Sequence, residues 1–358
     1  MSRDRGLEIL EKRIGEVPQW LRQTLSDPFP KQCLSPEVQQ VVTTGIGSSE
    51  AAARYLTALL NKTQSVASEY LPSSSFYGEL PPSTTGKHLV VFTQGLSSNA
   101  QIALERRDQF AGVTLVTSST PEGQTKSGKT DRATLLQALD REGVSIVTHP
   151  MEDEYEILPR IIGPICSLLA AWKIAQSLEG EDSTSQMERS LESAWAIDLP
   201  DDDVLHQCAE ELILGTDFYF TNSTYLYAQN LPAKVLETAF CPPPRIRDVL
   251  DYSHGPFQAE RATPGHRWIF TSEEPAEADL LAHLQPLLER VNRPTIIKSP
   301  FPEPFAIFYY ERFLNAVVLC AAKLAGHNLI DWPGKSEDGE GYSLQHPYRP
   351  RTEPIQGT

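Results

Sequence analysis

Residues 41–60 read VVTTGIGSSEAAARYLTALL, and this stretch decides the fold class. Its first residues are β-branched and predict a strand, whereas alanine and leucine recur at helical spacing from Glu50 to Asn61. Between strand and helix lies a glycine loop whose backbone N–H groups and hydroxyls can face an anion at the positive end of the helix. This order is typical of an α/β domain whose ligands bind at the carboxyl ends of the strands.

The same alternation continues along the first half of the chain. Further strands are predicted at 65–68, 88–93, 113–117 and 144–148, and helices at 99–110 and 157–178. An amphipathic N-terminal helix is predicted to end before Pro28. A β-α-β series of this kind predicts a parallel, doubly wound sheet.

The second half repeats this plan after a polar stretch, 178–186, that is typical of a linker. Strands are predicted at 218–221, 268–271 and 295–298, and helices at 204–214, 225–240, 276–291 and 308–325. Pro232 should kink the second of these helices or start a new one, because it lacks an N–H donor. With 358 residues, 40% of them hydrophobic, the chain can bury two cores, so two domains are expected.

Composition excludes several classes of partner. The formal net charge of -16 and the pI near 5.0 argue against binding to nucleic acid or to an anionic membrane, since both need a basic face. The five cysteines are widely spaced without a C-x-x-C pair, so neither a disulfide framework nor a zinc site is indicated, and they suit a reducing cytoplasm. The N-terminus carries no secretion signal, and the apolar run 161–178 contains Pro164 and Lys173, which favours a buried helix over a membrane span.

A second strand-to-helix loop, residues 93–99 (TQGLSSN), could also grip an anionic group. Its serines have a plainer explanation, because a serine that only caps a helix would look the same. The candidate binding residues of the two loops are Gly45, Gly47, Ser48, Ser49, Thr93, Gln94, Ser97 and Ser98.

The first loop has a competing explanation as a dinucleotide fingerprint, since Glu69 falls where a ribose-binding acid would lie. Glu50, however, occupies the place of the third glycine, where a charged side chain opposes close packing of helix on strand. The nicotinamide-dependent dehydrogenase is therefore the weaker interpretation.

Candidates for proton transfer lie close together in the second half. Lys234 and Glu237 are three residues apart and share a helix face, and His254-Gly255-Pro256 follows. Taken singly, Glu237 could be a solvated carboxylate paired with Lys234, and His254 could lie in an ordinary turn. Their order and spacing together favour a site for proton transfer.

These stretches resemble the double sugar isomerase (SIS) domain family, and most closely the isomerase part of the glucosamine-6-phosphate synthases. That family carries Ala-Leu-Lys-Leu-Lys-Glu on a helix, followed by Leu-Lys-His-Gly-Pro at nearly the separation seen here. By resemblance, Glu237 is the base that moves a proton between C1 and C2, His254 opens the sugar ring, and Lys234 stabilises developing charge or orients Glu237. In the second loop the family has Ser-Gln-Ser-Gly-Glu-Thr, which Thr93, Gln94 and Ser98 match in kind.

Two departures from the family pattern stand out. Gly95 and Leu96 replace a serine and a glycine, so one phosphate-binding hydroxyl is missing. At the C-terminus, Asp331-Trp332-Pro333-Gly334-Lys335-Ser336 resembles a closing segment whose lysine reaches the sugar, although it is three residues shorter. Lys335 is the candidate for that lysine.

The resemblance implies two SIS-like three-layer αβα domains with parallel, flavodoxin-like sheets. The expected boundaries are an N-terminal helical extension (1–33), a first domain (34–180), a linker and helix (181–200), a second domain (201–330) and a closing tail (331–358). The resemblance further implies a cytoplasmic homodimer that needs no metal and no organic cofactor. Its reaction would be the isomerisation, deamination or deglycation of a phosphorylated sugar or amino sugar through an enediol or enolamine. The alternative is a non-catalytic sugar-phosphate sensor.

Overall fold

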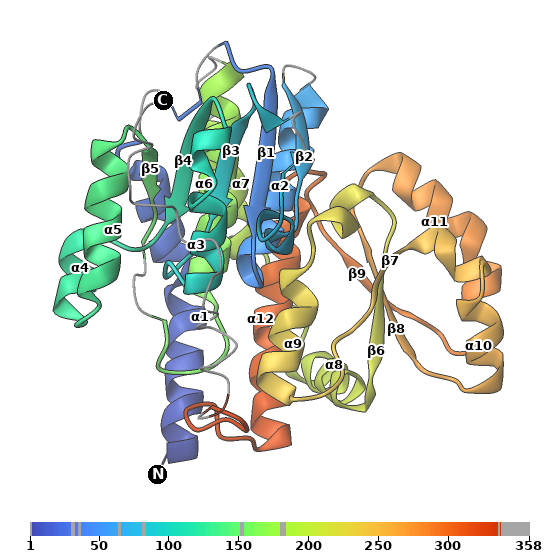
Figure 1. Cartoon of the computed structure of the whole chain (residues 1–358). Helices are drawn as coiled ribbons and strands as arrows, with labels where there is room; N and C mark the ends of the chain where they lie inside the picture. Colours follow the sequence, from blue (N-terminus) through green and yellow to red (C-terminus); the bar gives the residue numbers. More distant parts are fainter. Residues whose placement is uncertain are drawn as a thin grey trace.

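The chain forms two parallel sheets joined by a shared layer of helices (Figure 1). The computed structural model describes residues 2–29, 33–34, 37–63, 66–80, 84–150, 154–179, 184–335 and 337. Residues 180–183 of the predicted linker, together with Ser336 and residues 338–358 of the predicted tail, lie outside this part.

The first sheet has the strand order β2-β1-β3-β4-β5, and all its pairs are parallel. Its strands are β1 (Gln40–Gly45), β2 (Ala67–Tyr70), β3 (His88–Phe92), β4 (Gly112–Thr117) and β5 (Ser145–Thr148). The central strand β3 is buried along its whole length, as a strand covered on both faces must be.

The second sheet repeats this order with one strand fewer, as β7-β6-β8-β9, and is also parallel. Its strands are β6 (Thr216–Phe220), β7 (Ile246–Asp248), β8 (His266–Thr271) and β9 (Thr295–Lys298). The predicted class, two doubly wound parallel α/β sheets, is confirmed. The short strand β7 was missed, because three residues leave little periodicity to detect.

Helices cover both sheets. Those of the first half are α1 (Ser2–Ser26), α2 (Ser48–Thr63), α3 (Ser98–Leu104), α4 (Pro121–Lys126), α5 (Thr130–Arg141), α6 (Ile162–Glu179) and α7 (Thr184–Ala196). Those of the second half are α8 (Asp202–Leu214), α9 (Asn230–Ala239), α10 (Pro256–Ala262), α11 (Pro275–Leu288) and α12 (Ala306–Ala325), with 3₁₀ turns η4 (Ser223–Leu226) and η5 (Val249–Ser253). In Figure 1, α8, α9 and α12 cover the face of the second sheet toward the first half, and α10 and α11 cover the opposite face.

Two predicted helices differ from the structure in a way that matters for the site. The helix predicted over 157–178 begins only at Ile162, because the residues before it form an irregular segment that includes Pro159. The helix predicted over 99–110 ends at Leu104 and is followed by a 3₁₀ turn, Arg107–Gln109. Pro232 is the third residue of α9, so the expected new helix at this proline is confirmed.

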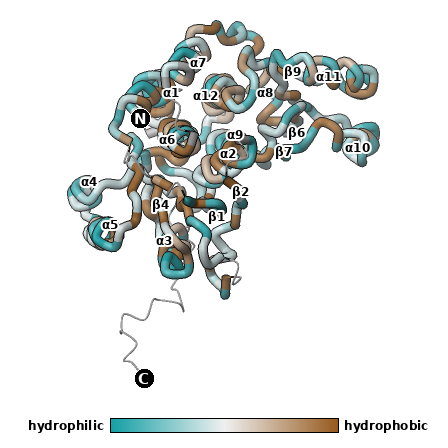
Figure 2. The backbone as a smooth tube through the Cα atoms, turned by 90° about the horizontal axis from the view of Figure 1, so that it is seen from above, coloured by the Kyte–Doolittle hydropathy of each residue, from teal (hydrophilic) through white to brown (hydrophobic). Residues whose placement is uncertain are grey.

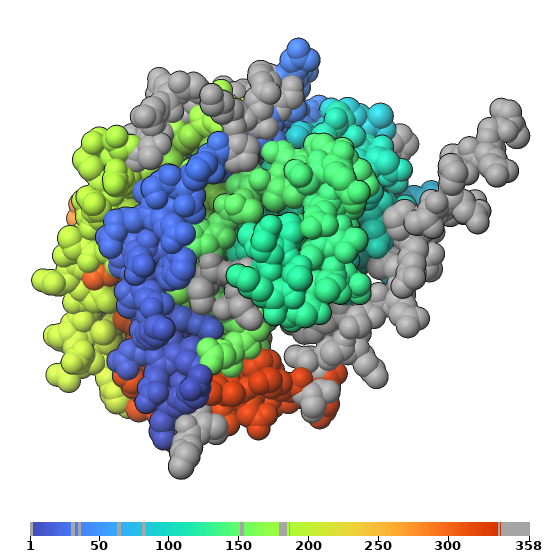
Figure 3. All heavy atoms as spheres, turned by 90° about the vertical axis from the view of Figure 1, so that its left-hand side faces the viewer, coloured from blue at the N-terminus to red at the C-terminus, as the bar shows by residue number. Residues whose placement is uncertain are grey.

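One hydrophobic core runs through both halves of the chain. It includes Leu10 and Val17 of α1, Ile165 of α6 and Phe308 of α12, all buried. Figure 2 shows α6, α12, α9 and α2 gathered between the two sheets. Helix α1 packs on α6 and α12, and Figure 3 shows it lying across one face of the molecule. Among the described helices, none has the length and apolarity needed to cross a membrane.

Candidate functional site

The carboxyl edge of the first sheet meets a buried carboxylate, Glu154. Its two oxygens accept hydrogen bonds from the backbone N–H groups of Ile161, Ile162 and Gly163, at 2.9, 2.8 and 2.9 Å. These are the first N–H groups of α6, which have no partner within the helix. Glu154 therefore occupies the positive end of this helix, where an anionic ligand could otherwise bind.

Gln94, in the loop after β3, is held against this carboxylate. Its side-chain amide donates to Glu154 Oε2 at 3.1 Å, and it lies so close to α6 that a Cβ on Gly163 would come 2.3 Å from Gln94 Cδ. Its main-chain carbonyl accepts from the hydroxyls of Ser118 and Ser119 at 2.9 and 3.2 Å. The second predicted loop is therefore rigidly placed beside Glu154.

Glu237 faces the same region from α9. Burial raises the pKa of Glu237 to about 7, against the opposing charges of Arg160 and Lys234 and a backbone hydrogen bond with Arg160, while Glu154 raises it further. A carboxylate with this pKa is ionised in part of the population at neutral pH and can both take and return a proton.

Arg160 supplies positive charge next to Glu237. Its guanidinium carbon lies 4.3 Å from the ring centre of Tyr155, and its Nη1 donates to the carbonyls of Glu154 and Leu158, at 2.9 Å each. Lys129 approaches the same tyrosine ring at 5.1 Å. Cations thus gather at this edge of a protein whose net charge is -16.

Lys234 bonds to side chains of α12, although it shares a helix with Glu237. It is buried, and its ammonium pairs with the carboxylate of Glu311 and donates to Asn315 Oδ1 at 2.6 Å, both on α12. In this position Lys234 stabilises the packing of α9 on α12 and reaches Glu237 only through its charge.

The first glycine loop lies next to the second, because β1 and β3 are neighbours in the sheet. A Cβ on Gly45 would come 2.4 Å from Ser49 O, so only glycine fits there, and Gly47 has a φ of +62° that favours glycine. Ser49 is buried and Ser48 half-buried at the start of α2.

Two of the three remaining loop hydroxyls are accessible. Thr93 is buried, Ser97 is half-buried and Ser98 is exposed. Ser97 is the N-cap residue of α3, but its side chain makes no capping hydrogen bond. The plain capping explanation therefore does not account for Ser97.

His254 is separated from Glu237 within one chain. It follows η5 and, with Gly255 and Pro256, lines a cavity of about 820 Å³ that also includes Arg245. Helix α10 begins there, on the face of the second sheet opposite α9 (Figure 1). A single chain does not bring the predicted acid and base together.

Lys335 lies in the segment after α12, which passes beside the residues that precede α6 and the end of α9. Leu158 N–H donates to Leu329 O at 3.1 Å, and the His327 ring lies 4.8 Å from that of Phe240, which ends α9. The Lys335 ammonium bonds to the Ile330 carbonyl and lies 4.3 Å from the Trp332 ring centre.

Sequence reasoning missed Glu154, Tyr155 and Arg160. They belong to the irregular segment before α6, which carries no motif and part of which was assigned to the helix. Glu69, the ribose-binding candidate of the dinucleotide interpretation, pairs with Lys87 at 2.5 Å. Among the described residues, no group of three or more His, Cys, Asp or Glu side chains is placed to hold a metal ion.

Comparison with known proteins places this geometry in a recognised fold. No protein-family model and no curated protein sequence matches the chain. Among solved structures, it is similar to the C-terminal domain of glucosamine-fructose-6-phosphate aminotransferase from Francisella tularensis, with 12% identity, a TM-score of 0.68, and 91% of this chain and 98% of that chain covered.

Two further solved structures share the fold. Tagatose-6-phosphate ketose/aldose isomerase from Escherichia coli is 15% identical, with a TM-score of 0.66 and coverage of 90% of this chain and 94% of that chain. Glucosamine-6-phosphate deaminase from Thermotoga maritima is 14% identical, with a TM-score of 0.59 and coverage of 89% and 94%. The predicted likeness to the double SIS proteins is thereby confirmed as a likeness of fold over about nine-tenths of the chain.

Proposed function

We propose that this protein is an enzyme that isomerises, deaminates or deglycates a phosphorylated sugar or amino sugar through an enediol or enolamine, without a metal or organic cofactor. The observation that carries the proposal is the position of Glu237, whose pKa is raised to about 7 where α9 meets the carboxyl edge of the first sheet. The solved structures of similar fold include two sugar-phosphate isomerising or deaminating enzymes, which supports the same class of substrate.

In the proposed mechanism Glu237 is the base. Its carboxylate takes the proton from the carbon next to the carbonyl or imine carbon, and the electron pair of that C–H bond moves to form the enediol or enolamine. The Arg160 guanidinium, whose charge acts on Glu237, stabilises the negative charge that develops on the substrate oxygen. The hydroxyl proton of the neighbouring carbon passes to that oxygen as the C=C electron pair takes the proton back from Glu237 at the former carbonyl carbon, which completes an isomerisation.

The anionic group of the substrate is proposed to lie between the two loops. Ser48, Ser49, Thr93 and Ser98 offer hydroxyls there, and Gly45 and Gly47 allow close approach of the backbone. Gln94 and Ser97 complete the proposed binding set, and Lys335 is proposed to approach with the closing segment. Lys234 is proposed to act through its charge on Glu237.

The separation of His254 from Glu237 supports a homodimer in which each site takes His254 from the other subunit. Mixed dimers test this arrangement. Equal amounts of Glu237→Gln and His254→Asn subunits, each inactive alone, should recover about one quarter of wild-type activity after exchange in a two-fold symmetric dimer. No recovery, with exchange verified by mass spectrometry, would refute a shared site.

The proposed chemistry is tested by proton NMR in D2O with phosphorylated and unphosphorylated ketoses, aldoses, amino sugars and amine-sugar adducts. The expected result is deuterium incorporation at C1 or C2, or conversion, for a phosphorylated member. The Glu237→Gln variant should lose it, and Glu289→Gln, which changes a glutamate on the second half remote from the site, should keep it. Silence of the wild-type protein across the panel would reject the catalytic assignment.

A non-catalytic sugar-phosphate sensor is the second candidate function. The absence of one phosphate-binding hydroxyl at Gly95 and Leu96, relative to the SIS pattern, is the observation that favours it. A sensor needs the two loops but not Glu237. Sugar-phosphate binding by the protein without any C–H exchange, unchanged in Glu237→Ala, would support the sensor.

A further inference from the structure

The two halves of the chain place equivalent parts around the carboxyl edges of their sheets. The first helix after β1 is α2, and the first α-helix after β6 is α9, and these two helices pack against one another between the sheets (Figure 1). A glutamate precedes the long helix that closes each half, Glu154 before α6 and Glu303 before α12. Helix α9, from the second half, lies at the carboxyl edge of the first sheet. By the same plan α2, from the first half, lies at the carboxyl edge of the second sheet.

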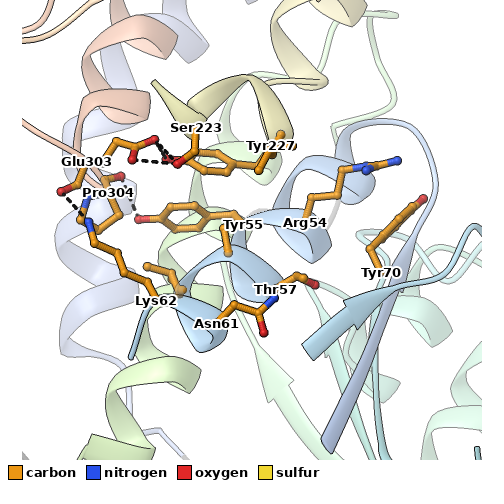
Figure 4. Close-up of a pocket in the computed structure, with 13 residues that line it drawn as sticks. Arg54, Tyr55, Thr57, Asn61, Lys62, Tyr70, Ser223, Tyr227, Glu303 and Pro304 are labelled. Carbon is orange, nitrogen blue, oxygen red and sulfur yellow. Dashed lines mark hydrogen bonds between the residues drawn. The ribbon is translucent and has the colours of Figure 1, made fainter. Parts of the chain in front are cut away.

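A cavity of about 510 Å³ lies at this second edge (Figure 4). It is lined by α2, by η4 after β6 and by the segment after β9. Its size is within the range of small-molecule sites. Ala58 and Leu226 give it an apolar wall, and Leu226 is 44% exposed.

Glu303 is held at one end of this cavity by hydroxyl groups. Ser223 Oγ donates to its carboxylate at 2.8 Å, Thr224 Oγ1 at 3.1 Å and the Tyr227 hydroxyl at 3.2 Å. The carboxylate is thus oriented by donors of the kind that a carbohydrate also carries. Figure 4 shows it beside Ser223 and Tyr227.

Lys62, on α2, is the cation at this edge, as Glu237 on α9 is the carboxylate at the first. Lys62 and Glu237 both lie seventeen residues after the last residue of the preceding strand. Lys62 is exposed, and its ammonium is 3.5 Å from the main-chain oxygen of Glu303, a long contact that a ligand can replace. Arg54 adds a second cation to the lining, pairing with Glu50 at 2.7 Å and lying 4.0 Å from the Tyr70 ring centre.

We infer that this cavity is a second binding site, for a carbohydrate that bears an anionic group. Sugar hydroxyls bond to Glu303 and Ser223, the apolar face of the ring packs on Leu226 and Ala58, and the anionic group meets the Lys62 ammonium. The inference does not rest on the proposed reaction, because it concerns a different cavity.

Hydrogen–deuterium exchange with mass spectrometry locates the site directly. Fructose 6-phosphate, fructose and inorganic phosphate are compared at equal concentration, in the Glu237→Gln background so that no turnover occurs. Fructose 6-phosphate should slow exchange in peptides that cover 223–227 and 303–308. Equal protection by fructose or by phosphate alone would overturn the assignment to an anionic carbohydrate.

Two variants and a control decide the location. In Lys62→Glu, protection of 223–227 should need about tenfold more fructose 6-phosphate. Ala58→Trp, which fills the cavity, should abolish the protection. Lys323→Glu, which changes an exposed lysine of α12 outside the cavity, should leave it intact. Protection that persists in both cavity variants overturns the inference.

Protection near residues 93–98 reports on the other site. If that region is protected and 223–227 is not, the second site is refuted and the proposed function stands. Protection of 223–227 alone supports the second site and counts against the proposed catalytic site.

Discussion

The carboxyl edges of the two sheets are built from the same arrangement of strands and helices. They differ in the side chain that the neighbouring helix places at the edge. At the first edge, α9 brings Glu237 to Arg160 and Glu154. At the second edge, α2 brings Lys62 to Glu303. The fold decides where helix and loop meet, and the side chains of these two helices then decide whether a carboxylate or a cation lies at each edge.

The two glutamates before the closing helices sharpen this difference. Glu154 accepts backbone N–H groups of α6, whereas Glu303 accepts hydroxyls of Ser223, Thr224 and Tyr227. The first carboxylate is committed to the fold, while the second lines a cavity. A glutamate that precedes the closing helix thus serves packing in one half and lines the proposed binding cavity in the other.

The largest expected effect is that of Glu237→Gln on turnover. We expect kcat to fall by about 10²–10⁴-fold, the usual contribution of a positioned general base, with ligand affinity changed only a few-fold. Isotope exchange followed by NMR and equilibrium dialysis measure the two quantities. Lys62→Gln, which likewise replaces a charged side chain by a neutral amide but at the other edge, should retain turnover. Equal losses in both variants would erase the distinction between the edges.

A comparison of the two helix lysines comes next. Lys234→Met should lower the free energy of unfolding by about 3–5 kcal/mol, because it leaves the Glu311 carboxylate buried without its partner. Lys62→Met, at an exposed position, should change it by less than about 0.5 kcal/mol. Urea unfolding measures both. Similar values for the two variants would show that Lys234 does not hold α9 on α12.

Glu277 is expected to stabilise the second edge more moderately. Its carboxylate accepts from Asn222 Nδ2 at 2.8 Å and from Ser272 Oγ at 2.7 Å, and these hydrogen bonds, with that of Thr221, outweigh burial and lower its pKa. Glu277→Gln should cost about 1–3 kcal/mol near neutral pH.

The pH dependence checks the sign of that contribution. The pKa of Glu277 is lower in the folded than in the unfolded protein. Glu277 therefore stabilises the fold fully at a pH above its unfolded pKa, and this stabilisation is lost as the pH falls through its folded pKa. The difference between wild type and Glu277→Gln in urea unfolding should shrink on acidification. A difference that grows would contradict the lowered pKa.

The smallest expected effect is the pH dependence set by Glu237. Since Glu237 must be ionised to act as base, kcat/KM should fall by about tenfold per pH unit below its pKa of about 7. Its folded pKa is raised, so its favourable contribution to stability is present below the unfolded value and is lost as pH rises through 7. Glu237→Gln should lack that loss of stability in unfolding experiments. A flat kcat/KM profile between pH 5 and 7 would remove Glu237 as the base.

Local sequence patterns predicted the fold and part of the site. The β-branched runs located eight of the strands, and the glycine loop after β1 was placed correctly at the start of α2. Lys234 and Glu237 lie on one helix, as their spacing indicates. Such predictions succeed because helical and strand periodicity are properties of neighbouring residues.

The partners of these side chains were decided by tertiary structure. Lys234 turns to Glu311, seventy-seven positions away, and Arg160 reaches Glu237 from a segment without a motif. His254 lies just before α10, which covers the opposite face of the second sheet from α9, although only seventeen residues separate His254 from Glu237. By itself the sequence determined two doubly wound sheets and the helix that carries the proposed base. Helices from distant parts of the chain pack between the sheets, and this packing decides which charges surround Glu237 and that Lys62 contacts Glu303. No local spacing in the sequence records that packing.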